Sequence, residues 1–122
     1  MVDFIFDKPF ILKMEVDFYE IIMLEVLNET NFNTHVKDGL KLVMFGSDIC
    51  HYCVKEQPVL EELANNDINI GKVDAYKVPA LAQKFGITAF PTFVLFKFGD
   101  VVTQFSGFKN KSELLDIVLQ HV

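Results

Sequence analysis

Short strand-like and helix-like segments alternate along this chain from about residue 21 to its end, and this alternation limits the possible folds more than any other feature. Residues 40–45 form a nearly all-apolar run, as expected of a central strand that is covered on both faces. Strands are predicted at 22–26, 40–45, 68–74, 92–98 and 101–105, and helices at 28–37, 54–65, 79–85 and from 110 onward. The order βαβαβαββα predicts an α/β fold, a central mixed β-sheet flanked by helices on both faces.

The predicted helix after residue 53 has an apolar side and a proline within it. Four apolar residues recur at helical spacing and can share a buried side: Val54, Leu60, Leu63 and Ala64. Pro58 falls inside this pattern, where it removes a backbone donor, so we expect it to kink the helix. Asn65-Asn66 then ends the helical pattern.

Other local signals predict where further elements begin and turn. Thr30 or Asn31 can cap the first helix, and Gly99-Asp100 has the length of a hairpin connection between the last two strands. Asn110 is followed three positions later by Glu113, the spacing of a capping box at the start of the last helix.

The only two cysteines of the 122-residue chain stand in one motif, Cys50-His51-Tyr52-Cys53, after an apolar strand and before a helix. Two thiols at this spacing can close a disulfide with little backbone movement. The first thiol attacks as a thiolate, which the amide dipoles of the following helix favour, and the second resolves the mixed disulfide. The motif therefore predicts thiol-disulfide exchange with no bound cofactor, the redox group being the Cys50-Cys53 disulfide itself.

The same motif could supply half of a zinc site, but its surroundings favour redox chemistry. A structural zinc ion normally takes four ligands from Cys and His. His51 lies between the two cysteines and would point away from a site shared by both sulfurs, while His35 and His121 follow no ligand spacing. We therefore expect no metal. A purely structural bridge is also disfavoured, since so short a loop contributes little loop-closure entropy.

Composition indicates a globular chain and excludes two classes of partner. Hydrophobic residues make up 51% of the chain, with 13 Phe and no Trp, so a Phe-packed core is expected. The net charge is −6 and all 11 basic residues are Lys, which argues against nucleic acid. No segment is apolar over the length of a membrane span. The first nine residues carry acids and a proline where a signal peptide would be basic and then apolar, so a cytoplasmic, thiol-reducing location is expected.

Residues 1–20 form an N-terminal extension that precedes the predicted 21–122 domain. Four apolar residues alternate with charged ones, a half-buried strand pattern: Leu12, Met14, Val16 and Phe18. This extra β segment could be an added edge strand or a continuation of the first strand. It could instead pair with another chain, giving a homodimer or a partner contact, since unpaired apolar strands recruit other strands.

Several spaced features together resemble the thioredoxin family over about residues 21–122. They are the CxxC motif, Pro58 five positions after Cys53, the segment Ile87-Thr88-Ala89-Phe90-Pro91-Thr92, the hairpin Phe96-Lys97-Phe98-Gly99-Asp100, and Gly107 before the last helix. The resemblance implies a thioredoxin fold in which Pro91 is cis and lies against the cysteine pair.

This resemblance also implies a substrate site and partners. The backbone N–H and C=O of Phe90, exposed by Pro91, would pair with an extended substrate segment in the manner of an added β-strand. Ile49 stands before the first cysteine, where the family usually has Trp, so one flank of that surface would be aliphatic. The implied substrates are protein disulfides, and the implied electron donor is a thioredoxin reductase or a similar dithiol donor.

Met44 and the dipeptide His51-Tyr52 also depart from the family pattern and leave alternatives open. Met44 takes the place of the family's buried Asp, so Cys53 must lose its proton to water or to another group such as Glu56 or Lys72, and we expect slower release of the mixed disulfide. The dipeptide His51-Tyr52 replaces the usual Gly-Pro. A protonated His51 would stabilise the Cys50 thiolate and make the couple more oxidising.

These departures keep three functions in view. A protein-disulfide reductase agrees with the N-terminus, which lacks a signal-peptide pattern. A disulfide oxidant or isomerase agrees with Tyr52, which resembles the residue at this place in periplasmic isomerases. An interaction module or assembly subunit with little turnover agrees with Met44 and Ile49.

Overall fold

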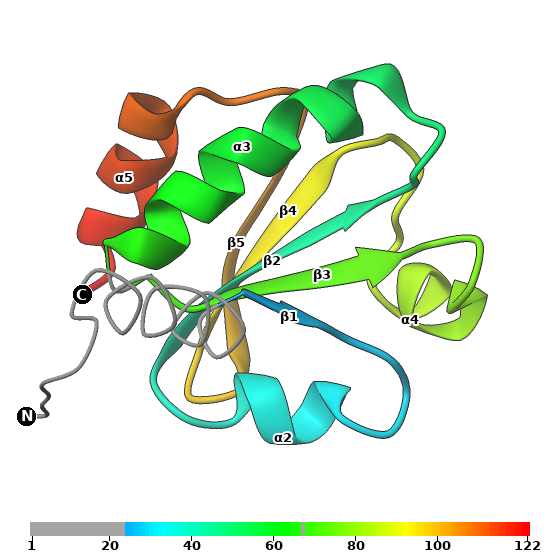
Figure 1. Ribbon diagram of the computed structural model, residues 1–122. Helices are drawn as coiled ribbons and strands as arrows, with labels where there is room; N and C mark the ends of the chain where they lie inside the picture. Colours follow the sequence, from blue (N-terminus) through cyan, green and yellow to red (C-terminus); the bar gives the residue numbers. More distant parts are fainter. Residues whose placement is uncertain (1–23, 67) are drawn as a thin grey trace, which may run out of the picture.

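The computed structural model describes residues 24–66 and 68–122, which form five strands and four helices in the predicted order (Figure 1). The strands are β1 (Leu24–Val26), β2 (Leu40–Gly46), β3 (Ile70–Asp74), β4 (Thr92–Lys97) and β5 (Asp100–Ser106). The helices are α2 (Phe32–Val36), α3 (His51–Asn65), α4 (Pro79–Lys84) and α5 (Lys111–Leu119). The predicted N-terminal strand, its contact with a second chain and the predicted strand start at Ile22 lie outside these residues.

The five strands form one mixed sheet in the order β1-β3-β2-β4-β5. β1 and β2 both pair with β3 in parallel, whereas β4 pairs antiparallel with β2 and with β5. The apolar run predicted as a central strand is β2, whose last five residues are all buried. The predicted α/β fold with a mixed sheet is therefore confirmed.

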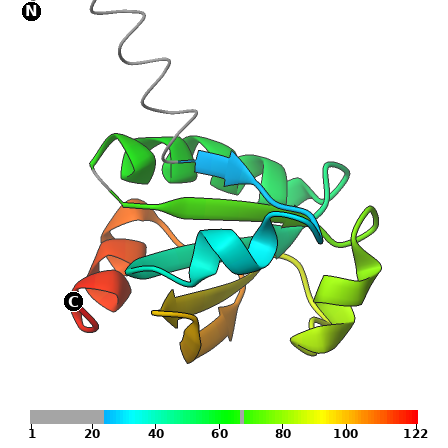
Figure 2. The same ribbon diagram turned by 90° about the horizontal axis from the view of Figure 1, so that it is seen from below.

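Helices cover both faces of the sheet, and the alternation of side chains along β2 explains why (Figures 1 and 2). Leu42 and Met44 point to the face that α3 and α5 cover. Val43 and Phe45 point to the opposite face, where they pack with buried residues of α2 and α4. A strand that is apolar at successive positions needs a partner layer on each side, which these two pairs of helices provide.

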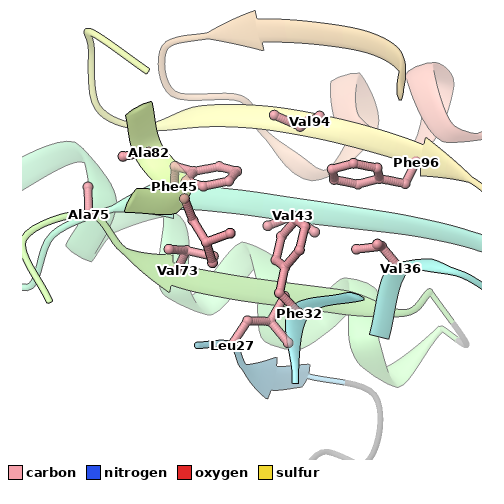
Figure 3. Packing of buried hydrophobic residues seen from close by; sticks show 11 residues of the cluster. Leu27, Phe32, Val36, Val43, Phe45, Val73, Ala75, Ala82, Val94 and Phe96 are labelled. Carbon is pink, nitrogen blue, oxygen red and sulfur yellow. The ribbon is translucent and has the colours of Figure 1, made fainter. Parts of the chain in front are cut away.

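Phenylalanines dominate the core on the α2/α4 face, as composition suggested. Phe85, which follows α4, lies 5.5 Å from the ring centres of both Phe32 and Phe96, and 5.8 Å from that of Phe45. Figure 3 shows Phe32, Phe45 and Phe96 gathered with valines from β2, β3 and β4. Tilted and edge-to-face aromatic pairs of this kind each add about 0.5–1.5 kcal/mol beyond the burial of their area.

Two local predictions were wrong. Val54 was expected on the buried side of α3 but is 57% exposed, because the buried stripe runs through Cys53 and Glu56 instead. The hairpin between β4 and β5 turns at Phe98-Gly99 rather than at Gly99-Asp100. Both turn residues have positive φ, +50° and +87°, as two-residue hairpin turns that match the strand twist require.

The capping box predicted for α5 is confirmed. The Asn110 side chain accepts a hydrogen bond from the backbone N–H of Glu113 at 2.9 Å, and the Glu113 carboxylate accepts one from Asn110 N–H at the same distance. Asn31 is the N-cap residue of α2, as one of the two predicted choices.

Sheet register brings three separate segments to one edge. β2 and β3 run parallel, so both end at this edge, and the chain enters α3 directly after β2. β4 runs the other way and begins there, with Thr92 paired to Phe45. This pairing places Pro91 beside Gly46, close to where the chain leads into the CxxC motif. No helix in the described ranges 24–66 and 68–122 is long and apolar enough to cross a membrane.

Candidate active site

Cys50 is the N-cap residue of α3, and the turn before it fixes this position. Its backbone N–H donates to Ser47 O at 3.2 Å, and its extended conformation (φ −85°, ψ 121°) lies outside the helix. The sulfur then accepts a hydrogen bond from the backbone N–H of Cys53 at 3.3 Å. The sulfur thus accepts one of the amide hydrogens that the first turn of a helix leaves without an intrahelical partner.

Cys53 lies in the first turn of the same helix, but its surroundings differ from those of Cys50. Cys53 is 4% exposed, whereas Cys50 is half-buried, and both are free thiols. Burial first, and then hydrogen bonding to the Cys50 side chain, raise the pKa of Cys53 to about 12, against a smaller lowering by the backbone of Ser47. The pair is therefore unequal: one accessible sulfur and one buried thiol that holds its proton.

Gly46 makes room for the buried thiol at the end of β2. A Cβ atom at this position would lie 2.7 Å from Cys53 Sγ and 3.4 Å from Met44 Cε. Real Cβ atoms do not approach other atoms to 2.7 Å, so only glycine lets α3 and its sulfur lie this close to the strand.

An open cavity of about 370 Å³ reaches Cys53 from the β1 side of α3. Met44, Gly46 and Lys72 contribute to its lining. Met44 thus lies beside the buried thiol, and its side chain is a thioether without a proton-accepting carboxylate. The Lys72 ammonium group donates a hydrogen bond to Gln57 Oε1. Within the described residues, no group of three or more His, Cys, Asp or Glu could hold a metal ion.

Pro91 follows a cis peptide bond with Phe90, as the family resemblance implied. Phe90 is half-buried, and its ring meets that of Tyr76 edge-on at 5.7 Å. In the part of the chain that the structure describes, no hydrogen bond engages the backbone N–H or C=O of Phe90. Both groups thus have no hydrogen-bond partner among the described residues.

The remaining predicted site residues lie on the surface around Cys50. Ile49 is 86% exposed, an unusually open position for a large aliphatic side chain. His51 and Tyr52 are also exposed, with their rings 5.3 Å apart. The structure therefore gathers all seven predicted residues, from Ile49 through Cys53 and at Phe90-Pro91, at one edge of the sheet.

Two residues of this region were missed or only mentioned by sequence reasoning. Tyr76 packs on Phe90 from the loop after β3, and nothing in its local sequence indicates this contact. Glu56 is fully buried, and its Oε1 accepts a hydrogen bond from Lys109 N at 3.0 Å. Its burial could have been read from helical periodicity, because Glu56 continues the stripe of Cys53, Leu60 and Leu63.

The Glu56 carboxyl group has an unusual acidity. Burial raises its pKa to about 7, and the charge of Glu113 adds to this, while the backbone and the charge of Lys109 act in the opposite direction. Glu56 in turn raises the pKa of Cys53 through its charge, although less than burial does. The charge of Glu56 therefore acts on Cys53 across one turn of α3.

A βαβαβαββα fold with a CxxC motif at the start of a helix and a cis-proline directly before β4 defines the class of thioredoxin-fold dithiol proteins, and comparison with known proteins names the family. The chain belongs to the thioredoxin family: a model of that family, described as Thioredoxin, matches residues 23–120. It is 37% identical over 101 residues to a thioredoxin of Chlamydia caviae, covering 81% of this chain and 99% of the relative. It is 34% identical over 99 residues to a thioredoxin of Staphylococcus saprophyticus, covering 79% and 95%.

Solved structures agree with this assignment. A mutant thioredoxin from Halobacterium salinarum superimposes with a TM-score of 0.77 at 28% identity, covering 80% of this chain and 89% of that one. A thioredoxin from Malassezia sympodialis gives 0.70 at 28% identity, covering 80% and 90%. The chain is accordingly a thiol-disulfide oxidoreductase, and the substrate class that goes with its family is the protein disulfide.

Proposed function

We propose that the protein is a protein-disulfide reductase in which Cys50 is the nucleophile and Cys53 the resolving thiol. The observation that carries this proposal is the inequality of the two sulfurs. Cys50 is only half-buried, and its Sγ accepts an amide hydrogen at the start of α3. Cys53 is buried, with a pKa raised to about 12 mainly by burial, and so it holds its proton until the second step.

The reaction divides into two exchanges. The Cys50 thiolate attacks one sulfur of the substrate disulfide, the substrate S–S bond breaks, and the first substrate thiolate leaves and takes up a proton. Cys53 then loses its proton and attacks Cys50 Sγ, which breaks the mixed disulfide and releases the second substrate thiol. Two electrons have passed to the substrate, and the protein holds the Cys50-Cys53 disulfide as its redox group.

We further propose that substrate lies along Phe90-Pro91. The unengaged backbone groups of Phe90 suit an extended segment added as a strand, which recognises backbone more than side chains. Ile49 and Tyr76 flank this edge with exposed apolar surface, to which side chains next to the substrate disulfide would pack. His51 and Tyr52 adjoin the nucleophile and would tune it.

Partners and location follow from the same role. A reductase needs a dithiol donor to restore its thiols, which we propose to be a thioredoxin reductase or a similar protein, and a cytoplasmic location keeps the pair reduced. A homodimer through residues 1–20 stays a prediction.

Reduction of insulin disulfides, driven by dithiothreitol, tests the proposal. The protein should accelerate insulin precipitation, Cys50→Ser should abolish the acceleration, and Cys53→Ser should accumulate a mixed disulfide visible by mass spectrometry. Wild-type protein that gives no acceleration and no mixed disulfide would contradict the proposal and favour an interaction module. A mixed disulfide that accumulates in Cys50→Ser instead of in Cys53→Ser would reverse the assigned roles.

A further inference from the structure

The second exchange raises a chemical problem at Cys53. Its thiol is buried, and burial together with the Cys50 side chain holds its proton. The thiolate is the nucleophile in disulfide exchange, so this proton must leave before Cys53 can attack. In the mixed disulfide Cys50 carries neither a charge nor a thiol, which removes two of the influences that raise the Cys53 pKa. Burial remains, and a proton acceptor is still required.

Most polar groups near the cavity at Cys53 are poor acceptors. Met44 is a thioether, and the Lys72 ammonium group has no lone pair. Asp74 Oδ1 already accepts hydrogen bonds from the backbone N–H groups of Tyr76 and Lys77, at 2.9 and 3.3 Å. Asp48 is exposed, and its carboxylate lies 3.9 Å from Lys77 Nζ. Both carboxylates are therefore already engaged, one by backbone N–H groups and the other by a lysine.

Glu56 differs from these groups in burial and in hydrogen bonding. It is 0% exposed and stands one helical turn after Cys53, on the same buried side of α3. Its Oε1 accepts the hydrogen bond from Lys109 N. Its Oε2 is buried and has no hydrogen-bond partner among residues 24–66 and 68–122. An orphaned carboxylate oxygen in an apolar environment costs stability, and a role in proton transfer would explain why it is kept.

We propose that Glu56 is the proton acceptor for the Cys53 thiol when Cys53 attacks the mixed disulfide. Glu56 Oε2 takes the proton as the Cys53 sulfur bonds to Cys50 Sγ, and the bond from Cys50 to the substrate sulfur breaks. The protonated carboxyl group then returns its proton to the departing thiolate or to solvent. This assignment rests on the roles proposed above for Cys50 and Cys53. The proposed base therefore lies on α3, whereas the side chain that β2 places beside Cys53 is Met44, which cannot accept a proton.

The groups that surround Glu56 fit a base that works near neutral pH. Cys53 lies one turn before it on the buried side of α3, Lys109 N–H donates to it from the segment before α5, and Glu113 acts on it through its charge from α5. The side chains that β2 and β4 contribute to this face, Met44 and Phe93 among them, are apolar. Burial and Glu113 raise the pKa of Glu56 to about 7, where a general base accepts protons effectively while still being ionised.

Stopped-flow reaction with dithiobis(nitrobenzoate) separates the two exchanges. Attack by Cys50 releases one nitrothiobenzoate in a phase whose rate depends on reagent concentration. Attack by Cys53 on the mixed disulfide releases the second in a concentration-independent phase. Glu56→Gln keeps the size of the side chain and an oxygen for Lys109 N, but removes the base. We expect it to slow only the second phase, by about a hundredfold at neutral pH.

The direction of the change distinguishes proton transfer from charge alone. Ionised Glu56 disfavours the Cys53 thiolate, so a carboxylate that acted only through its charge would give a faster second phase once removed. We expect the second phase of Glu56→Gln to be slower than that of the wild type. The difference in rate should become smaller as pH rises, because hydroxide then replaces the missing base. A second phase that is unchanged, faster, or slowed equally at every pH would overturn the proposal. A missing first phase would instead refute the role of Cys50.

Two further variants guard against a structural explanation. Glu62→Gln removes an exposed carboxylate from the same helix and should leave both phases unchanged. Met44→Asp added to Glu56→Gln supplies a carboxylate beside Cys53 from β2, and should restore most of the second-phase rate. If that double variant does not fold, the pH dependence of iodoacetamide labelling in Cys50→Ser decides. In this background Glu56→Gln should lower the pKa of Cys53, although the same substitution slows the second phase when both cysteines are present. A Cys53 pKa that stays unchanged would contradict the proximity of Glu56 to Cys53 on which the proposal depends.

Discussion

Cys50 and Cys53 have different surroundings although three positions separate them in the chain. Cys50 caps a helix and accepts an amide hydrogen, while Cys53 lies within the buried stripe that continues to Glu56. Two identical side chains thus acquire different reactivities from their places on one helix. A dithiol with such unequal members can attack with one sulfur and keep the other protonated until the mixed disulfide forms.

Glu56 should make the stability of the protein depend on pH. Its folded pKa of about 7 lies above the ordinary value of 4.5, so the folded state binds this proton more tightly than the unfolded state. The contribution of the protonated Glu56 side chain to the free energy of unfolding is fully present below about pH 4.5 and is lost as pH rises toward 7. Urea unfolding should show that the wild type loses about 1–3 kcal/mol across this window relative to Glu56→Gln. Parallel pH dependences in the two proteins would contradict the burial of an ionisable Glu56.

Sequence reasoning at this scale predicted the cysteine pair and the order in which its members attack, but not the difference in burial between the two thiols. The CxxC spacing and the helix after it predicted the pair, because both signals are local. The burial of Cys53 depends on how α3 meets β2, and the bond from Lys109 to Glu56 joins residues 53 positions apart. The residues next to the motif do not indicate the bond from Lys109, whereas the stripe of Cys53, Glu56, Leu60 and Leu63 could have indicated the burial of Cys53.

At the scale of elements, the contact between α3 and β2 depends on Gly46. Gly46→Ala should destabilise the protein by about 1–3 kcal/mol, because the new methyl group overlaps Cys53 Sγ and forces the helix or the strand to shift. Urea unfolding measures this cost. In a double-mutant cycle the same substitution should cost less in a Cys53→Ala background, where the sulfur is absent. Equal costs in both backgrounds would show that the sulfur is not what Gly46 accommodates.

The start of α5 depends on its capping box. Asn110→Ala removes the acceptor for Glu113 N–H and should cost about 1 kcal/mol in urea unfolding. Ser112→Ala is the matched control, since Ser112 is exposed in the same turn and should change stability by less than about 0.5 kcal/mol. A loss as large for Ser112 as for Asn110 would contradict the role of the cap.

Periodicity predicted the elements well where each could be read from its own residues. The capping box and the apolar β2 strand are local signals, and the structure has both of them. The hairpin was misplaced by one residue because Phe98 adopts a positive φ that a bulky side chain rarely takes. Val54 was misplaced because a helical pattern fixes a stripe only when its polar members, here Glu56, are counted too.

At the scale of the whole molecule, the site exists because distant segments meet at one sheet edge. β2 leads into the CxxC motif, and β4 begins directly after Phe90-Pro91. The segment before α5 places the backbone N–H of Lys109 against Glu56. Element order was predictable from the sequence, whereas the strand order β1-β3-β2-β4-β5 is a property of long-range pairing. The family resemblance implied a thioredoxin fold, but the strand order itself was not predicted from the sequence.

The reduction potential of the Cys50-Cys53 couple tests the central claim most directly. Equilibration in graded dithiothreitol and glutathione buffers, followed by counting free thiols, gives this value, with Cys50→Ser as the control that shows no two-electron couple. A potential of about −270 mV is predicted for a protein-disulfide reductase. A potential of about −120 mV would contradict the assignment as a reductase and make the protein a disulfide oxidant.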